Sequence, residues 1–271
     1  MVAYSAYQHL VVERQDGIAL ITMNRPEVYN ATNARLHYEL GRIWLDIGED
    51  ADVRVAVITG AGKAFSAGGD LDMIEGFLGD AAAIANTMKE AGDIVYNITN
   101  LEKPVISAIN GIAVGAGLAV ALMADISIAS ENARFTDGHI RLGVGAGDHS
   151  VIIWPLLCGM ARAKRYLLTA DFLDAKEAER IGLVSMVVPH EHLMPTAMEF
   201  ARKLAQGPQS AIRWTKRALN QWLRVMGPAF DYSLATEMLG FFGPDVREGL
   251  QALREKRQPN FPTAQGKSGG D

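Results

Sequence analysis

A run of twenty residues from Val105 to Ala124 contains only two polar side chains, and it limits the possible folds of this chain more than any other feature. A run of this length could cross a membrane as one helix. However, the turn dipeptide Asn110-Gly111 interrupts the run, and Pro104 and Asp125 bound it closely. We therefore predict no membrane span but a buried strand over Val105–Ile109, a turn, a helix from Gly115 to Met123, and a second buried strand over Ile126–Ala129.

Strand and helix patterns alternate along the chain from residue 10 to residue 190. The turn residues Gln15-Asp16-Gly17 separate two alternating runs, which predicts a β-hairpin. The further predicted elements are a helix over Asn33–Ile47, a strand over Val53–Thr59, a weakly helical and mobile stretch over Leu71–Gly79, and a helix over Ala81–Asn100. This alternation is typical of a layered α/β core with crossover helices.

After Pro189 only helical patterns remain, and three Gly-Pro dipeptides divide them. We predict helices over Glu191–Ala205, Gln209–Val225, Pro228–Leu239 and Pro244–Lys256. The small, polar residues that follow predict disorder. The expected organisation is a core over residues 1–190, a helical region over 191–261 and a disordered tail over 262–271.

Charge and cysteine content exclude several functional classes. The formal net charge is −5, which disfavours binding to nucleic acid. The single cysteine, Cys158, excludes an internal disulfide and a site with several cysteine ligands. No His, Asp or Glu cluster has the spacing of metal ligands, so we expect no metal.

The first ten residues lack the pattern of a secretory signal, and we expect a cytoplasmic protein.

Two glycine clusters indicate where a ligand could bind. Neither a P-loop nor a dinucleotide-binding glycine pattern is present. The segment Ser66–Asp70 follows a predicted strand, and Gly115–Gly117 opens a predicted helix. Small residues at such points allow backbone N–H groups to approach a ligand. Two N–H groups directed at one point would form an oxyanion hole.

Four segments together resemble a known family. They read AFSAGGDL from Ala64, KPVISAINGIAVGAGLAVALMAD from Lys103, AKEAERIGLV from Ala175 and EGLQALREKR from Glu248. In this combination and order the chain is similar, over about residues 8–261, to the crotonase (enoyl-CoA hydratase/isomerase) superfamily.

The resemblance implies a fold and a substrate class. The fold would be α/β, with a crotonase-like ββα spiral core and a C-terminal helical region that assembles a homotrimer or a dimer of trimers. The substrate would be an acyl-CoA thioester, with coenzyme A as part of the substrate and no separate cofactor. The implied contacts are the backbone N–H groups of Gly69 and Ala116 at the carbonyl oxygen, Ala67, Gly68, Asp70 and Leu71 around the substrate, and Lys256 near the CoA phosphates.

The chain departs from the superfamily at the two glutamates of its hydratases, whose positions hold Ala119 and His139. Neither residue can act as one of two paired carboxylates. Asp148 lies beyond His139 across a glycine-rich turn, and a carboxylate can orient an imidazole. We therefore propose a catalytic pair of His139 and Asp148, which resembles the β-diketone (C–C) hydrolase branch. Alternatively, Asp148 caps a helix that starts near His149.

The sequence leaves three functions open. The first is an enoyl-CoA hydratase/isomerase-family lyase or isomerase that stabilises an enolate with an atypical acid–base set. The second is a hydrolase that cleaves the C–C bond of a β-diketone with the His139–Asp148 pair. The third is a catalytically silent CoA-binding protein. Affinity for CoA and turnover of a thioester would distinguish them.

Overall fold

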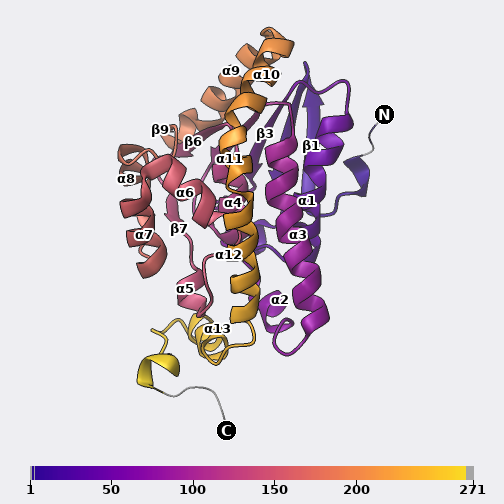
Figure 1. The fold of residues 1–271 in the computed structure, drawn as a ribbon. Coiled ribbons are helices and arrows are strands. Elements are labelled where there is room, and N and C mark those ends of the chain that lie inside the picture. Colours follow the sequence, from indigo (N-terminus) through magenta and orange to yellow (C-terminus); the bar gives the residue numbers. More distant parts are fainter. Residues whose placement is uncertain (1, 3, 267–271) are drawn as a thin grey trace.

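A six-stranded sheet forms the centre of the fold, in the order β1-β2-β3-β4-β6-β9 (Figure 1). The structure, a computed structural model, describes residue 2 and residues 4–266. The strands β1 and β2 are antiparallel, and the following pairs are parallel. The strands are β1 (Leu10–Gln15), β2 (Ile18–Met23), β3 (Val55–Gly60), β4 (Val105–Ile109), β6 (Ile126–Ser130) and β9 (Met186–Val188).

The first two strands form the predicted hairpin. Asp16 and Gly17 both have positive φ angles, of 55° and 81°. This backbone conformation at two central residues matches the right-handed twist of the paired strands. The turn therefore sets the register that pairs Gln15 with Ile18.

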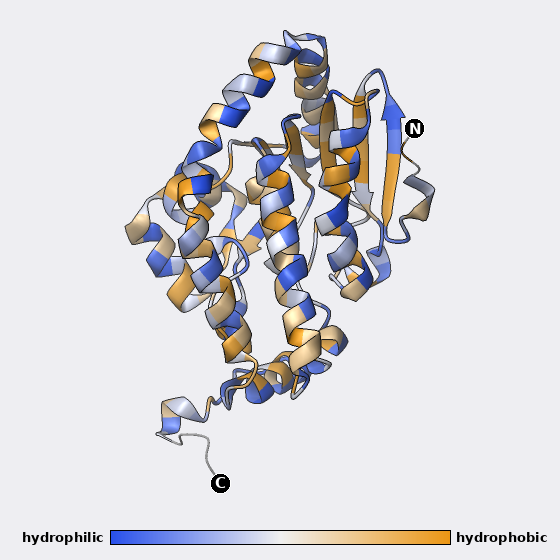
Figure 2. Cartoon of the chain, turned by 45° about the vertical axis from the view of Figure 1, so that its right-hand side comes forward, coloured by the Kyte–Doolittle hydropathy of each residue, from blue (hydrophilic) through white to orange (hydrophobic). Residues whose placement is uncertain are grey.

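Helices cover both faces of the sheet, so its central strands are buried throughout (Figure 1). Val55 and Val57 of β3 pack in one cluster with α9 (Leu193–Gln206). Ala56 and Ile58 face the opposite cluster, to which α1 (Ala34–Glu49) and α3 (Ala81–Asn100) contribute. Hydrophobic residues concentrate in the strands, whereas the surrounding helices mix hydrophobic and hydrophilic positions (Figure 2). Strands covered on both faces have continuous apolar sequences.

The long apolar run has the predicted structure, with β4 followed by α4 (Gly115–Met123) and β6. Seven of the nine residues of α4 are buried, from Gly117 to Met123. No helix in the described part of the chain is long and apolar enough to cross a membrane. Cys158 is buried.

A second sheet of three short strands leads into the segment that contains His139. It has the order β5 (Ala113–Val114), β7 (Arg134–Thr136) and β8 (Leu173–Asp174). The chain passes from β7 into α5 (His139–Leu142), and α2 (Leu71–Glu75) follows the first glycine cluster. Three further helices complete this part: α6 (Ser150–Cys158), α7 (Met160–Thr169) and α8 (Ala175–Arg180).

The C-terminal region is helical, as predicted, and α12 crosses in front of the core in Figure 1. The predicted helix 209–225 is divided at Asn220, whose Nδ2 donates a hydrogen bond to the carbonyl of Thr99 at 2.8 Å. The helices are α10 (Gln209–Leu219), α11 (Gln221–Val225), α12 (Gly227–Gly240) and α13 (Asp245–Glu255).

The start of the predicted disordered tail is ordered. Thr263–Gln265 forms a 3-10 turn, and the backbone N–H of Thr263 donates a hydrogen bond to Asp245 Oδ1 at 3.0 Å. This contact ties residues 262–266 to α13, which sequence composition could not predict. Residues 267–271 of the predicted tail lie outside the described residues.

Candidate active site

A cavity of about 760 Å³ brings the predicted site residues together. Its wall is formed by both glycine clusters, by α5, and by parts of α1, α3, α12 and α13. All predicted site residues line it: Ala67, Gly68, Gly69, Asp70, Leu71, Ala116, His139, Asp148 and Lys256. Ala119 also lines the cavity, so both residues that we expect at the positions of the hydratase glutamates, Ala119 and His139, face the same space.

Backbone hydrogen bonds hold the two glycine clusters side by side. The N–H of Ser66 donates to the carbonyl of Ile112, and the N–H of Val114 donates to the carbonyl of Ser66, both at 3.0 Å. A Cβ atom added to Gly115 would lie 3.5 Å from Gly68 Cα. Gly68 and Gly115 have φ angles of +97° and +53°, a region that favours glycine. The glycines are therefore needed for the backbone path on both sides of the cavity.

Two backbone N–H groups remain available at this junction. In the described part of the chain, neither the N–H of Gly69 nor that of Ala116 donates a hydrogen bond. Ala116 lies in the first turn of α4, where N–H groups have no partner within the helix and carry partial positive charge. Two such donors on one cavity wall are suited to hold a carbonyl oxygen that gains negative charge.

Asp70 has a structural role at the edge of the cavity. Its Oδ1 accepts a hydrogen bond from the N–H of Asp72 at 3.1 Å and caps α2, and Arg25 contacts its Oδ2 at 3.2 Å. Arg254 of α13 pairs with Asp72 and with Glu75 of α2. Lys256 is the C-cap residue of the same helix, α13.

His139 contacts three carboxylates. Its Nδ1 lies 2.8 Å from Asp137 Oδ1. Its Nε2 lies 3.3 Å from Glu237 Oε1 and 3.8 Å from Asp148 Oδ2. The predicted partners His139 and Asp148 therefore lie close together, but Asp148 does not orient the ring. Asp137 orients it instead, and Glu237 is the nearest carboxylate to the other nitrogen.

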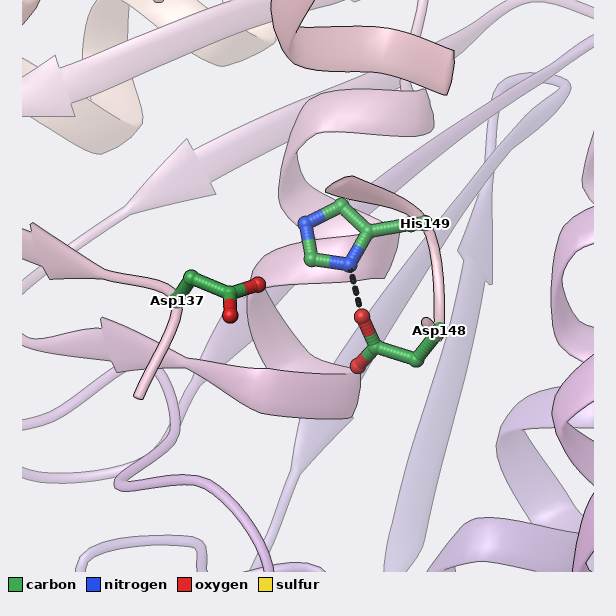
Figure 3. Close-up of side chains that lie close together, drawn as sticks. All are labelled: Asp137, Asp148 and His149. Atoms are coloured by element: carbon green, nitrogen blue, oxygen red, sulfur yellow. Dashed lines mark hydrogen bonds and ion pairs between the residues drawn. The ribbon is translucent and has the colours of Figure 1, made fainter. Parts of the chain in front are cut away.

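Asp148 is bonded to the neighbouring histidine (Figure 3). Its Oδ1 lies 2.5 Å from His149 Nδ1, and His149 is only 1% exposed. The expectation of a helix cap at Asp148 is wrong, since His149 is the N-cap residue of α6 and no side chain caps that helix. Ser150 Oγ donates to Asp137 Oδ2, which completes a buried polar network.

The electrostatics of this network follow from burial and from the surrounding charges. Burial opposes protonation of His139, but the carboxylates of Asp137, Glu237 and Asp148 outweigh it and raise the histidine pKa well above its ordinary value. Burial raises the pKa of Glu237, against the effect of His139. Burial also opposes ionisation of Asp148, but His149 and His139 lower its pKa to about 2.

The arrangement provides a transferable proton in the same cavity as the two N–H donors. Glu237 Oε1 faces His139 Nε2, whereas Glu237 Oε2 is buried without a hydrogen-bond partner. The pair can exist as imidazolium and carboxylate, or as imidazole and carboxylic acid. Because both side chains line the cavity, either form could exchange a proton with a bound molecule.

We expect His139 to be protonated at pH 7. A histidine whose pKa is raised on folding contributes stability below its unfolded pKa of about 6.5, and this stability is lost as the pH rises through the folded pKa. An NMR titration of isotopically labelled histidine should show an imidazolium at pH 7, and Asp137→Asn should lower its pKa. A midpoint near 6.5 in the unmodified protein would contradict this assignment.

Sequence reasoning missed Asp137 and Glu237. Asp137 lies two residues before His139, so its position on the same loop could have identified it as a partner of the histidine. Glu237 lies on α12, and only the tertiary structure brings that helix over the core. The helix α12 packs closely against Gly147, because a Cβ atom at Gly147 would lie 2.5 Å from Glu237 Cβ.

A group of potential metal-ligating atoms was also missed. One such atom from each of Asp137, Asp148 and His149 lies within 4.8 Å of the others (Figure 3). Residue spacing did not reveal this cluster because a turn brings its parts together. The same side chains already form hydrogen bonds with His139, Ser150 and one another.

Comparison with known proteins gives one consistent result. Residues 13–264 match the enoyl-CoA hydratase/isomerase family. The chain is 34% identical to a crotonyl-CoA hydratase of Syntrophomonas wolfei, over 94% of this chain and 98% of that protein. It is 33% identical to the 1,2-epoxyphenylacetyl-CoA isomerase of Escherichia coli, over 91% of this chain and 95% of that protein.

A solved structure supports the same conclusion. The crystal structure of an enoyl-CoA hydratase/isomerase from Mycobacterium paratuberculosis superposes with a TM-score of 0.86 at 36% identity, covering 90% of this chain and 97% of that one. This similarity confirms the predicted crotonase fold, with its mixed α/β core and C-terminal helices. Fold and sequence thus agree that the chain is an enzyme of the enoyl-CoA hydratase/isomerase family.

Proposed function

We propose that this enzyme forms and reprotonates an enolate of an acyl-CoA thioester. One observation carries this proposal. The backbone N–H groups of Gly69 and Ala116, which donate no hydrogen bond in the described part of the chain, line the same cavity as the His139–Glu237 pair. The N–H groups would stabilise the thioester oxygen as it gains negative charge. The His139–Glu237 pair would take a proton from the acyl group and return it.

The acid–base pair favours proton transfer within the substrate over simple addition of water. A hydratase of this superfamily positions water with two glutamates, and Ala119 and His139 stand at those positions. A carboxylate at Glu237, assisted by the imidazolium of His139, could remove a proton and deliver it to another carbon. Such a shift is an isomerisation, which the family also includes.

A second candidate is hydrolysis of a C–C bond in a β-diketone. Its support is the same histidine, which is held by Asp137 and lies near Asp148 and Glu237. In this reaction the Glu237 carboxylate, assisted by the imidazolium of His139, would take a proton from water as the water attacks a carbonyl. The C–C bond would then break, the enolate would be the leaving group, and the proton would return to the enolate carbon. The electron pair of the broken C–C bond would then be held as an enolate at the N–H groups.

Exchange of protons with solvent tests the proposal whatever the net reaction. Butanoyl-CoA incubated with the enzyme in D₂O should gain deuterium at the carbon next to the thioester, measured by mass spectrometry. Exchange would also exclude a catalytically silent CoA-binding protein. Binding of butanoyl-CoA without exchange, and without turnover of any thioester offered, would overturn the proposal.

Hydration of crotonyl-CoA should be slow. Without the paired glutamates, water lacks positioned acid–base assistance, and such a loss commonly costs a factor of about 10²–10⁴. The measurement is the loss of crotonyl-CoA absorbance, compared with the Syntrophomonas wolfei crotonyl-CoA hydratase as reference. A rate equal to that of the reference enzyme would show that other groups replace the glutamates.

Lys256→Ala should weaken binding of CoA thioesters by about 1 kcal/mol or more, because a charge-assisted contact with a phosphate would be lost. Lys256 lines the cavity at the end of α13. Calorimetry with butanoyl-CoA would measure the change. Lys203→Ala, on the exposed side of α9, is the matched control and should bind normally. Equal weakening by both variants would argue against a specific role for Lys256.

We also propose that the helical region 191–261 assembles a homotrimer or a dimer of trimers, as the resemblance implies. Trp214 and Trp222 are 71% and 67% exposed on α10 and α11. Exposed aromatic residues on neighbouring helices are typical of protein interfaces. Light scattering coupled to size-exclusion chromatography would distinguish a trimer, a dimer of trimers and a monomer.

A further inference from the structure

A second histidine–carboxylate pair lies in the wall of the active-site cavity. His37 of α1 and its partner Glu90 of α3 are joined by a contact of 2.9 Å between Nδ1 and Oε2. His37 lines the cavity and is only 6% exposed. The oxyanion hole and the His139 network do not use this pair.

Glu90 holds the imidazole in a fixed orientation. Its Oε1 accepts a hydrogen bond from Asn86 Nδ2 at 2.9 Å, and its Oε2 contacts His37 Nδ1. Both oxygens of the carboxylate are therefore engaged. In the described part of the chain, the structure gives His37 Nε2 no hydrogen-bond partner. The oriented ring thus presents one free nitrogen.

The surroundings of His37 in the cavity are largely apolar. Ala91 and Ile94 of α3 line the same wall, one and four residues after Glu90. A polar nitrogen in such surroundings is unfavourable unless a ligand or a water molecule meets it. His37 therefore presents one polar nitrogen to the cavity within a largely apolar wall.

We infer that the acyl group of the substrate carries a second oxygen, as a keto or hydroxyl group beyond the thioester carbonyl, and that His37 Nε2 binds it. This inference rests on the proposed function and specifies its substrate class. The imidazole nitrogen can donate to a keto oxygen or accept from a hydroxyl group, depending on its protonation. His37 is thus a residue that determines specificity and does not transfer the proton.

Binding of matched thioesters tests this inference. Calorimetry would compare butanoyl-CoA with 3-oxobutanoyl-CoA, and hexanoyl-CoA with its 5-oxo and 5-hydroxy derivatives. At least one oxygenated thioester should bind about tenfold more tightly than its parent, as expected when a site is built to bond a polar group. Tighter binding of an oxo derivative would indicate that His37 donates a hydrogen bond, and tighter binding of the hydroxy derivative would indicate that it accepts one.

Two variants connect the preference to His37. In His37→Phe the preference for oxygen should disappear, while the parent thioesters bind as before. His37→Gln keeps a polar group near the position of Nε2 and should retain part of the preference. Thr87→Val, on another polar side chain of the same wall, is the control and should keep all of it. Thermal unfolding would confirm that each variant folds.

The outcomes separate this inference from the proposed function. Equal affinities for parent and oxygenated thioesters in the unmodified enzyme, or a preference that survives in His37→Phe, would overturn the inference alone. Failure of butanoyl-CoA and hexanoyl-CoA to bind would overturn the CoA-based function, and this inference with it.

Discussion

Glu237→Gln should slow deuterium exchange into butanoyl-CoA by about 10²–10⁴-fold, which is the usual cost of losing a positioned acid–base group. The amide has nearly the size of the carboxylic acid but can neither take nor give the proton. It can still contact His139 Nε2, which lies 3.3 Å from Glu237 Oε1. Mass spectrometry measures the exchange rate, and calorimetry should show that butanoyl-CoA still binds.

The pKa of His139 provides a second measurement on the same variant. Because the carboxylate of Glu237 helps to raise that pKa, Glu237→Gln should lower it. Met238→Leu is the matched control, since Met238 lines the same cavity and does not titrate. Exchange at the normal rate in Glu237→Gln would show that Glu237 is a buried structural carboxylate.

Ala116→Pro should reduce the exchange rate by about 10²–10³-fold, the usual effect of losing one oxyanion-hole donor. Proline has no backbone N–H, and the first turn of a helix tolerates it because N–H groups there have no helical partner. The variant thus removes the proposed donor from α4 without breaking a hydrogen bond of the described structure. Affinity for butanoyl-CoA should change much less, because the donor acts mainly when the oxygen becomes negative.

Ala116→Gly is the control for this experiment, because it retains the N–H while changing the side chain. Its exchange rate should stay within a few fold of normal. A comparison of the melting temperatures of the two variants would detect any general damage to α4. If Ala116→Pro folds, binds butanoyl-CoA and exchanges protons at the normal rate, the oxyanion hole does not include this N–H.

The glycine clusters were predictable because their chemistry is local. Gly68 and Gly115 have left-handed backbone conformations, and Gly69 and Ala116 supply N–H groups from the main chain itself. Such features depend on a few consecutive residues and on the strands that precede them. The hairpin, the helix α3 and the alternating strands and helices of the core were predictable for the same reason.

The polar network around His139 was only partly predictable, because side chains from distant segments compete for the same imidazole. The sequence identified His139 and Asp148, which the structure brings within 3.8 Å. Packing of α12 over the core places Glu237 nearer to the imidazole than Asp148. The turn after β7 brings Asp137 into contact with Nδ1 of the same ring. The sequence by itself thus determined the family and the α/β order of the core, and it predicted the backbone donors. Only the tertiary structure decided which carboxylates face the histidine, since burial and helix packing fix those distances and the resulting charges.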